Sequence, residues 1–163
     1  WGTNTYLLGQ DQIAVIDPGP ESDTHLDAIL AATKGEAITH ILVTHAHADH
    51  SPLAARLSEL TGAPILGFGR ANAGRSDLMQ RLARADDLEG GEGVDTHFRP
   101  DIEVRDGDQI TGEHWQLHVV HTPGHFAGHL SFVLWRSRDG LGLNSDLATR
   151  WRSWRLYGHL PTA

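Results

Sequence analysis

Cysteine is absent from this chain of 163 residues, and lysine occurs once, at Lys34. The lack of thiols excludes disulfide bonds, cysteine nucleophiles, thiolate zinc sites and iron–sulfur clusters. A metal site in this chain therefore has to use nitrogen and oxygen ligands, which suit zinc, iron and manganese. The sequence also lacks the G-x-S-x-G elbow of serine hydrolases. It has no dinucleotide fingerprint, because Gly67-Phe68-Gly69 is not followed by a third glycine at the required spacing.

Long apolar runs and a secretory signal pattern are missing as well. No segment approaches the ~20 apolar residues that a membrane-spanning helix needs. The net charge of −8 disfavours a broad nucleic-acid surface, because phosphate binding needs clustered Lys and Arg. These absences predict a cytoplasmic protein with a small-molecule substrate, no membrane partner and RNA as the less favoured substrate. They predict nothing about its oligomeric state.

Four potential metal ligands, His45, His47, Asp49 and His50, lie within the six residues of the HAHADH run. The run follows an apolar, β-branched segment (38–44) that predicts a buried strand. Ser51 as an N-cap residue, Pro52 as a first helical residue and the apolar repeat after them predict that a helix starts directly behind the run. The chain holds 12 histidines, so accidental clustering is the alternative interpretation. A strand-to-helix loop is where α/β proteins place their chemistry, which favours a site.

The spacing of these residues predicts two metal positions. In extended chain alternate side chains point the same way, so His45 and His47 can face one metal. Asp49 and His50, where the loop turns into the helix, are offset and can face a second metal. Two metals about 3.5 to 4 Å apart can share a hydroxide with a pKa of roughly 7, which would be a nucleophile.

A second histidine cluster follows the strand-like residues 115–120. It runs from His121 through Thr122-Pro123-Gly124-His125 to His129, and Pro123-Gly124 predicts a turn. We expect His125 to be the third ligand of the first metal, because three histidines and a water are typical of a catalytic zinc. His121 and His129 are expected to lie nearby, and turn or surface histidines are the alternative for both.

The HAHADH run resembles the HxHxDH signature of the metallo-β-lactamase superfamily, and residues 122–125 resemble its TPGH motif. The stretches TNTYL, THAHADHS and HTPGHFAGHLSF are most similar to the branch of the LACTB2-like hydrolases and the glyoxalase II enzymes. The resemblance implies an α/β fold, a four-layered αββα sandwich with two divalent metals at one edge, zinc being favoured over iron or manganese.

The resemblance also implies a role for each site residue. His45, His47 and His125 would bind the first metal, Asp49 and His50 the second, and Asp146 would bridge them. Asp49 would in addition be catalytic by orienting the hydroxide of a metal-dependent hydrolase. The acidic net charge and the absence of a basic stripe favour an ester, a thioester or a related bond as its target over RNA. Residues 14–19, a turn that contains Asp17, resemble part of the family's opening segment. Asp17 is a candidate to fix the tautomer of an imidazole, because we expect its turn to lie beneath the HAHADH loop.

The last part of the chain departs from the family. Ser145 stands where glycine usually precedes the bridging aspartate, and residues 147–163 do not resemble the family at all. His159 is a weak candidate for the sixth ligand. We therefore expect a metallo-β-lactamase-like domain over residues 1–146 and an atypical tail over 147–163, in an incomplete chain. Two alternatives stay open: an endoribonuclease-type phosphodiester hydrolase of the same fold, and a non-catalytic metal-binding remnant.

The scaffold can be assigned in outline. Residues 21–32 predict an amphipathic helix capped by Ser22. Residues 101–110 and 116–120 predict strands of the second half, with Asp106-Gly107 as their turn.

Overall fold

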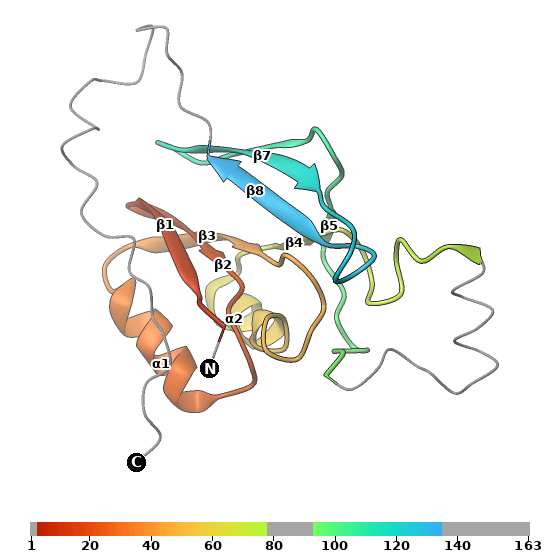
Figure 1. Ribbon diagram of the computed structural model, residues 1–163. Helices are drawn as coiled ribbons and strands as arrows, with labels where there is room; N and C mark the ends of the chain where they lie inside the picture. The colour runs from red at the N-terminus through yellow and green to blue at the C-terminus, as the bar shows by residue number, and fades with distance from the viewer. Residues whose placement is uncertain (1–2, 78–92, 135–163) are drawn as a thin grey trace, which may run out of the picture.

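The computed structural model describes residues 3–77 and 93–134, and these residues form two β-sheets and two helices (Figure 1). The elements in chain order are β1 Tyr6–Gln10, β2 Gln12–Ile16, α1 Asp23–Ala32, β3 Ala37–Leu42, α2 Leu53–Thr61, β4 Ile65–Gly67, β5 Ile102–Glu103, β6 Gln109–Thr111, β7 Gln116–His121 and β8 Leu130–Leu134.

The first sheet has the strand order β1-β2-β3-β4-β5. β1 and β2 form an antiparallel hairpin, whereas β2, β3, β4 and β5 pair in parallel. Alternation along β2 sends Ile13 and Val15 to one face and Ala14 and Ile16 to the other. Because β2 and β3 are parallel, the residues that follow both strands meet at one edge of the sheet.

Both helices cover one face of this sheet (Figure 1). The predicted cap of the first helix is confirmed, because the Ser22 hydroxyl accepts a hydrogen bond from the backbone N–H of His25. α2 ends at Thr61 and is capped by Gly62, whose φ of 75° is a left-handed conformation that glycine adopts without strain. Leu26 and Ile29 of α1 and Leu53 and Leu57 of α2 form a core with the sheet.

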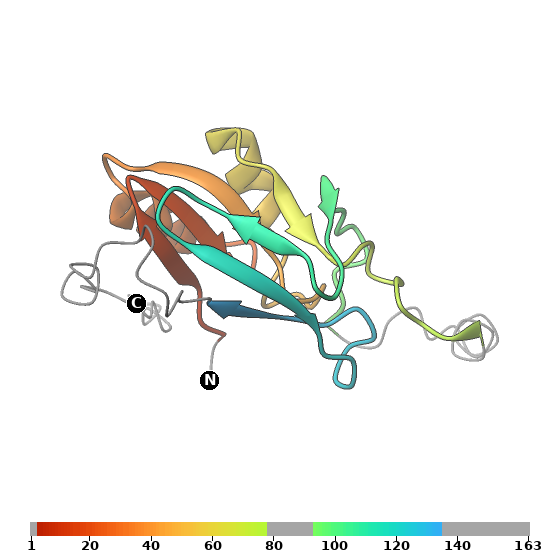
Figure 2. The ribbon, with the colours of Figure 1, turned by 90° about the horizontal axis from the view of Figure 1, so that it is seen from above.

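The second sheet, β6-β7-β8, is antiparallel and lies over the other face of the first sheet (Figure 2). Its Leu117, Val119 and Leu130 are buried against Ala14 and Leu42 of the first sheet. Two hydrophobic cores therefore separate three layers: helices, first sheet and second sheet. Within residues 3–77 and 93–134 no helix covers the outer face of the second sheet, so the described part contains three layers of the predicted αββα sandwich.

The strand prediction for residues 101–110 was wrong in one respect. Ile102 and Glu103 form the edge strand of the first sheet, and the chain crosses to the second sheet before β6. The Asp106-Gly107 turn thus joins the two sheets, with Gly107 at a φ of 86°. It is not the turn between the two predicted strands.

No helix in the described part of the chain is long and apolar enough to cross a membrane.

Candidate metal centre

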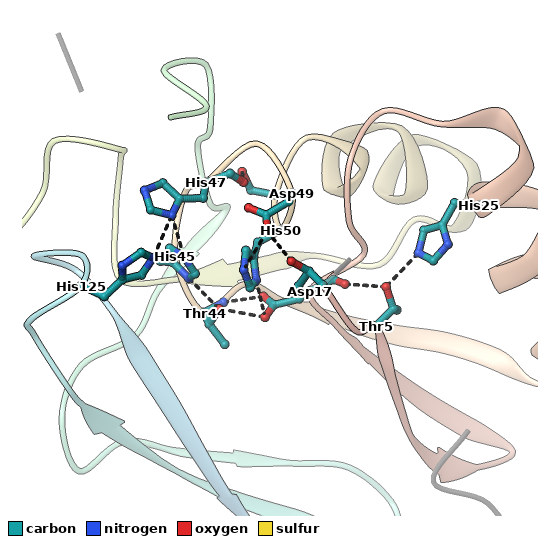
Figure 3. Close-up of polar contacts among 11 residues, drawn as sticks. Thr5, Asp17, His25, Thr44, His45, His47, Asp49, His50 and His125 are labelled. Carbon is teal, nitrogen blue, oxygen red and sulfur yellow. Dashed lines mark hydrogen bonds and ion pairs between the residues drawn. The ribbon is translucent and has the colours of Figure 1, made fainter. Parts of the chain in front are cut away.

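The HAHADH loop leaves the carboxyl end of β3 and runs to the start of α2, as its flanking patterns predicted. The second sheet joins it there, because the backbone N–H of Leu130 donates to the carbonyl of Thr44 (2.9 Å). This bond places the β7–β8 loop, residues 122–129, beside the HAHADH loop, residues 45–50, which is called the metal loop below. The two histidine clusters, about eighty positions apart in the sequence, therefore meet at one edge of the two sheets (Figure 3).

His45, His47 and His125 converge on one point. The Nδ1 atom of His47 lies 3.0 Å from Nε2 of His45 and 3.1 Å from Nε2 of His125, and the three ligand atoms lie within 4.8 Å of one another. Zinc–nitrogen bonds of 2.0–2.1 Å in a tetrahedron separate two ligand nitrogens by about 3.3 Å. The three nitrogens thus fit one metal ion with small adjustments, and within residues 3–77 and 93–134 no fourth ligand joins this group.

The protonation of these histidines suits metal binding, which needs neutral imidazoles. Burial, followed by the neighbouring imidazoles, lowers the pKa of His45 to about 3. Burial and the approach of His125 lower the pKa of His47 as well. Both rings are therefore neutral at pH 7, with lone pairs available for a cation.

Asp17 controls the tautomers of two of the histidines. It directly follows β2, is almost fully buried, and accepts a hydrogen bond from Nδ1 of His50 (2.9 Å). It also accepts one from the Thr44 hydroxyl (2.8 Å), which in turn lies 3.0 Å from Nδ1 of His45. Since Thr44 uses its proton toward Asp17, Nδ1 of His45 has to be the donor. In both His45 and His50, Nε2 is consequently the nitrogen that carries the lone pair.

The predicted place of Asp17 beneath the metal loop is thus confirmed, whereas its effect on metal binding remains a prediction. Burial opposes a charge on His50, but the hydrogen bond and charge of Asp17, together with Asp49, raise the pKa of His50 overall. A metal at Nε2 would have to compete with this proton, which predicts that the second position is the more sensitive to acid.

Asp49 lies on the same side of the loop as His50, with its carboxylate 3.6 Å from Nε2 of His50. Its side chain is 60% exposed and accepts a hydrogen bond from the Thr3 hydroxyl. Burial works against the charged form, but Thr3, His50 and the local backbone lower the pKa of Asp49 overall. Asp49 and His50 together offer two ligands for a second cation, next to the first group.

The metal loop is also held from the side by residues 93–95. Ala48 N–H donates to the carbonyl of Gly93 (2.6 Å), and Asp95 N–H donates to the carbonyl of Ala46 (2.9 Å). The Ser51 hydroxyl contacts the Asp95 carboxylate (2.8 Å) and the carbonyl of His47 (3.2 Å). Ser51 was predicted to cap α2, but no side chain caps that helix. No local sequence pattern marks Asp95, because Ser51 and Asp95 are far apart in the chain and meet only in the folded structure.

The other two histidines of the second cluster lie close to the site. Nε2 of His121 donates to the carbonyl of Ala127 (2.9 Å), which closes the loop that carries His125. His129 packs against the ring of His45, with ring centroids 4.9 Å apart, and burial lowers its pKa. Nδ1 of His129 contacts the Thr122 hydroxyl (2.8 Å). Asp146 and His159 lie outside the described residues.

Comparison with known proteins agrees with this geometry. The sequence profile of the Metallo-beta-lactamase superfamily matches residues 1–138. A hydroxyacylglutathione hydrolase of Pseudomonas aeruginosa is 34% identical over 119 residues, covering 73% of this chain and 36% of that protein. The β-lactamase-like protein 2 homologue of Drosophila melanogaster is 32% identical over 143 residues, covering 82% and 43%. The chain thus spans less than half the length of either relative.

Solved structures give the same result. ETHE1 from Myxococcus xanthus has a TM-score of 0.54 and 28% identity over 80% of this chain and 48% of that chain. A metallo-β-lactamase from Cronobacter sakazakii has a TM-score of 0.60 and 28% identity over 79% of this chain and 51% of that chain. The described part of this chain therefore shares its fold with part of both structures.

Proposed function

The chain belongs to the metallo-β-lactamase superfamily, and from this premise we propose that it is part of a metal-dependent hydrolase of small esters or thioesters. The observation that carries the proposal is the convergence of His45, His47 and His125 on one point, with Asp49 and His50 directly beside it. Three imidazole donors with a fourth position open are the ligand set of a catalytic zinc site.

Two divalent ions, zinc being favoured over iron and manganese, would supply Lewis acidity and activate a water molecule when bound. The first would be held by His45, His47 and His125, and the second by Asp49 and His50 together with Asp146. The protein's own contribution is to keep these groups in the right protonation state. Asp17 and Thr44 hold protons on Nδ1 of His50 and His45, so that both Nε2 atoms face the site.

Asp49 has a further role in this proposal. Its exposed carboxylate, kept ionised at neutral pH, is an acceptor that can orient an attacking water by taking a hydrogen bond from it. Thr3 holds that carboxylate in place with its hydroxyl. The relatives named as hydroxyacylglutathione hydrolases and the acidic net charge of this chain favour a small thioester over RNA.

The test is to purify the chain and to count zinc, iron and manganese per polypeptide before assaying a glutathione thioester, a lactone, a β-lactam and single-stranded RNA. We expect about two metals and thioester hydrolysis that is lost in His125→Ala and kept in His114→Ala. His114 lies on the exposed β6–β7 connection and serves as the matched control. Binding of one metal without hydrolysis would support a non-catalytic remnant instead, and cleavage of RNA alone would support the endoribonuclease alternative.

A further inference from the structure

A buried hydroxyl links helix α1 to the metal centre. Thr5, directly before β1, is 1% exposed, and its hydroxyl donates to the backbone carbonyl of Asp17 (2.7 Å). Nε2 of His25, in the first turn of α1, lies 2.8 Å from the same hydroxyl oxygen. A carbonyl only accepts, so the Thr5 proton has to point at Asp17. His25 must therefore donate from Nε2, and the hydrogen bonds run from His25 through Thr5 to Asp17 (Figure 3).

The backbone at Asp17, whose carbonyl accepts the last of these hydrogen bonds, has an unusual conformation. Asp17 has a φ of 51°, a left-handed value that residues with a β-carbon rarely adopt. Such a conformation persists only where the surroundings hold it. Here Asp17 N–H donates to the carbonyl of Leu42 (2.8 Å), and the Asp17 carbonyl is held by Thr5. The orientation of the Asp17 carboxylate toward Thr44 and His50 depends on this backbone.

His25 also packs on the turn itself. A β-carbon at Gly19 would lie 3.2 Å from Nε2 and Cδ2 of His25, so the ring fits closely against the glycine. Gly19 N–H donates to the carbonyl of His50 (3.0 Å), and the Gly19 carbonyl accepts from Leu53 N–H (3.1 Å). The turn 17–19 thus touches the metal loop through both its side chain and its backbone.

We propose that His25 and Thr5 are positioning residues for the metal centre, acting through Asp17 on the tautomers of His50 and, through Thr44, of His45. Neither residue contacts the ligand nitrogens. Their contribution is to fix the left-handed backbone at Asp17, so that its carboxylate keeps accepting from Nδ1 of His50 and from Thr44. The proposal rests on the proposed function only for its consequence in catalysis, because the tautomers are a property of the metal-free chain.

Two pairs of variants test the hydrogen bonds separately from packing. Thr5→Val keeps the shape and removes the hydroxyl, whereas Thr5→Ser keeps the hydroxyl. His25→Leu removes the donor, whereas His25→Gln carries an amide N–H that can reach the same oxygen. His114→Gln is the control, because His114 is an exposed histidine on the β6–β7 connection.

The first readout is the nitrogen-15 chemical shifts of the imidazoles in the metal-free chain, which report the tautomer of each ring. We expect His50 to carry its proton on Nδ1 in the native sequence, in Thr5→Ser, in His25→Gln and in the control. In Thr5→Val and His25→Leu we expect a mixture of the two tautomers. The second readout is titration with zinc, in which Thr5→Val and His25→Leu should bind the ion at the second position, that of Asp49 and His50, about tenfold less tightly.

An unchanged His50 tautomer in both Thr5→Val and His25→Leu would overturn the proposal, as would a mixture of tautomers in the native chain. Failure of His25→Gln to restore the tautomer would also overturn it, because packing of the ring would then be what matters. If Thr5→Val does not fold, the two His25 variants decide alone, since His25 is only half-buried on α1. Absence of hydrolysis in the native chain would count against the proposed function and would leave the tautomer result unaffected.

Discussion

The two groups of candidate ligands in the HAHADH loop are neighbours in sequence but are assembled in different ways. His45 and His47 need His125, which comes from a loop of the second sheet. Asp49 and His50 are oriented by hydrogen bonds to Thr3 and Asp17, which flank the first hairpin. The first group therefore depends on how the two sheets pack together. The second group depends on side-chain contacts at one edge of the first sheet.

Asp17 connects the two groups, although unequally. It contacts His50 directly but reaches His45 only through the Thr44 hydroxyl. We therefore expect the two candidate metal positions, although served by one loop, to respond separately to mutation. Four measurements test whether they do.

The largest expected effect is that of removing the ligand from the second sheet. His125→Ala should abolish tight binding at the first position, a greater loss than the ~10- to 100-fold that residues behind the ligands contribute. Because His125 is exposed, the fold should persist with an unchanged circular dichroism spectrum. Zinc titration and metal content measure the effect, with His114→Ala as control. Unchanged zinc affinity and metal content in His125→Ala would show that the three histidines do not form one site.

Asp17→Asn should weaken the second position more than the first. In one orientation of the asparagine side chain, its amide N–H would face the backbone N–H of Thr44. In the other orientation, it would face the Thr44 hydroxyl and Nδ1 of His50. A donor therefore meets a donor in either orientation. We expect the second zinc ion to bind about 10- to 100-fold more weakly. Asp11→Asn is the matched control, because Asp11 also has a positive φ (60°) but lies exposed in the β1–β2 turn. Equal losses at both positions would remove the distinction between the two groups.

Leu130→Ala tests the packing between the sheets. Leu130 is fully buried between them, and its N–H is bonded to Thr44 beside the metal loop. Truncation of such a side chain costs about 2–5 kcal/mol of unfolding free energy. The first metal position should lose several-fold in affinity while the second changes less. Denaturant unfolding and zinc titration measure both, and Leu60→Ala, on the exposed face of α2, should alter neither.

The smallest expected effect concerns pH and the metal-free chain. Burial places the pKa of His45 at about 3 in the folded chain, below its ordinary value of 6.5. The unfolded chain therefore takes up the proton first, and stability falls as the pH is lowered from 6.5 toward 3. His50, with a raised pKa, acts in the opposite sense: its contribution is complete below pH 6.5 and is lost at higher pH.

The measurement is the unfolding free energy with a chelator present, between pH 4.5 and 6.5, where most carboxyl groups are already ionised. As the pH is lowered, the unfolding free energy of the native chain should decrease relative to that of His45→Gln, by at most about 1.4 kcal/mol per pH unit. Parallel curves for the two proteins would mean that His45 is not held neutral by its surroundings.

Much of the fold could be predicted from local patterns. The β-branched run before the HAHADH loop forms β3, and the Ser22 signal caps α1 as expected. The strand boundaries in residues 101–110 could not be predicted, because Ile102 and Ile110 are both apolar and only their partners place them in different sheets. Leu60 likewise fits the apolar repeat of α2, yet it is 59% exposed because nothing in the described residues packs over that face.

For the site, the residue types and their spacing were enough to identify His45, His47, Asp49, His50 and His125 as candidates, since ligand chemistry and the strand-to-helix position are both local features of the sequence. Only the tertiary structure decided which groups hold those candidates. The contacts from Thr3, Thr5 and Asp95 and the tautomers of the rings arise where distant segments meet at the sheet edge. Hydrogen bonds of this kind depend on distances of a few ångströms between segments that are remote in sequence, and no local pattern fixes those distances.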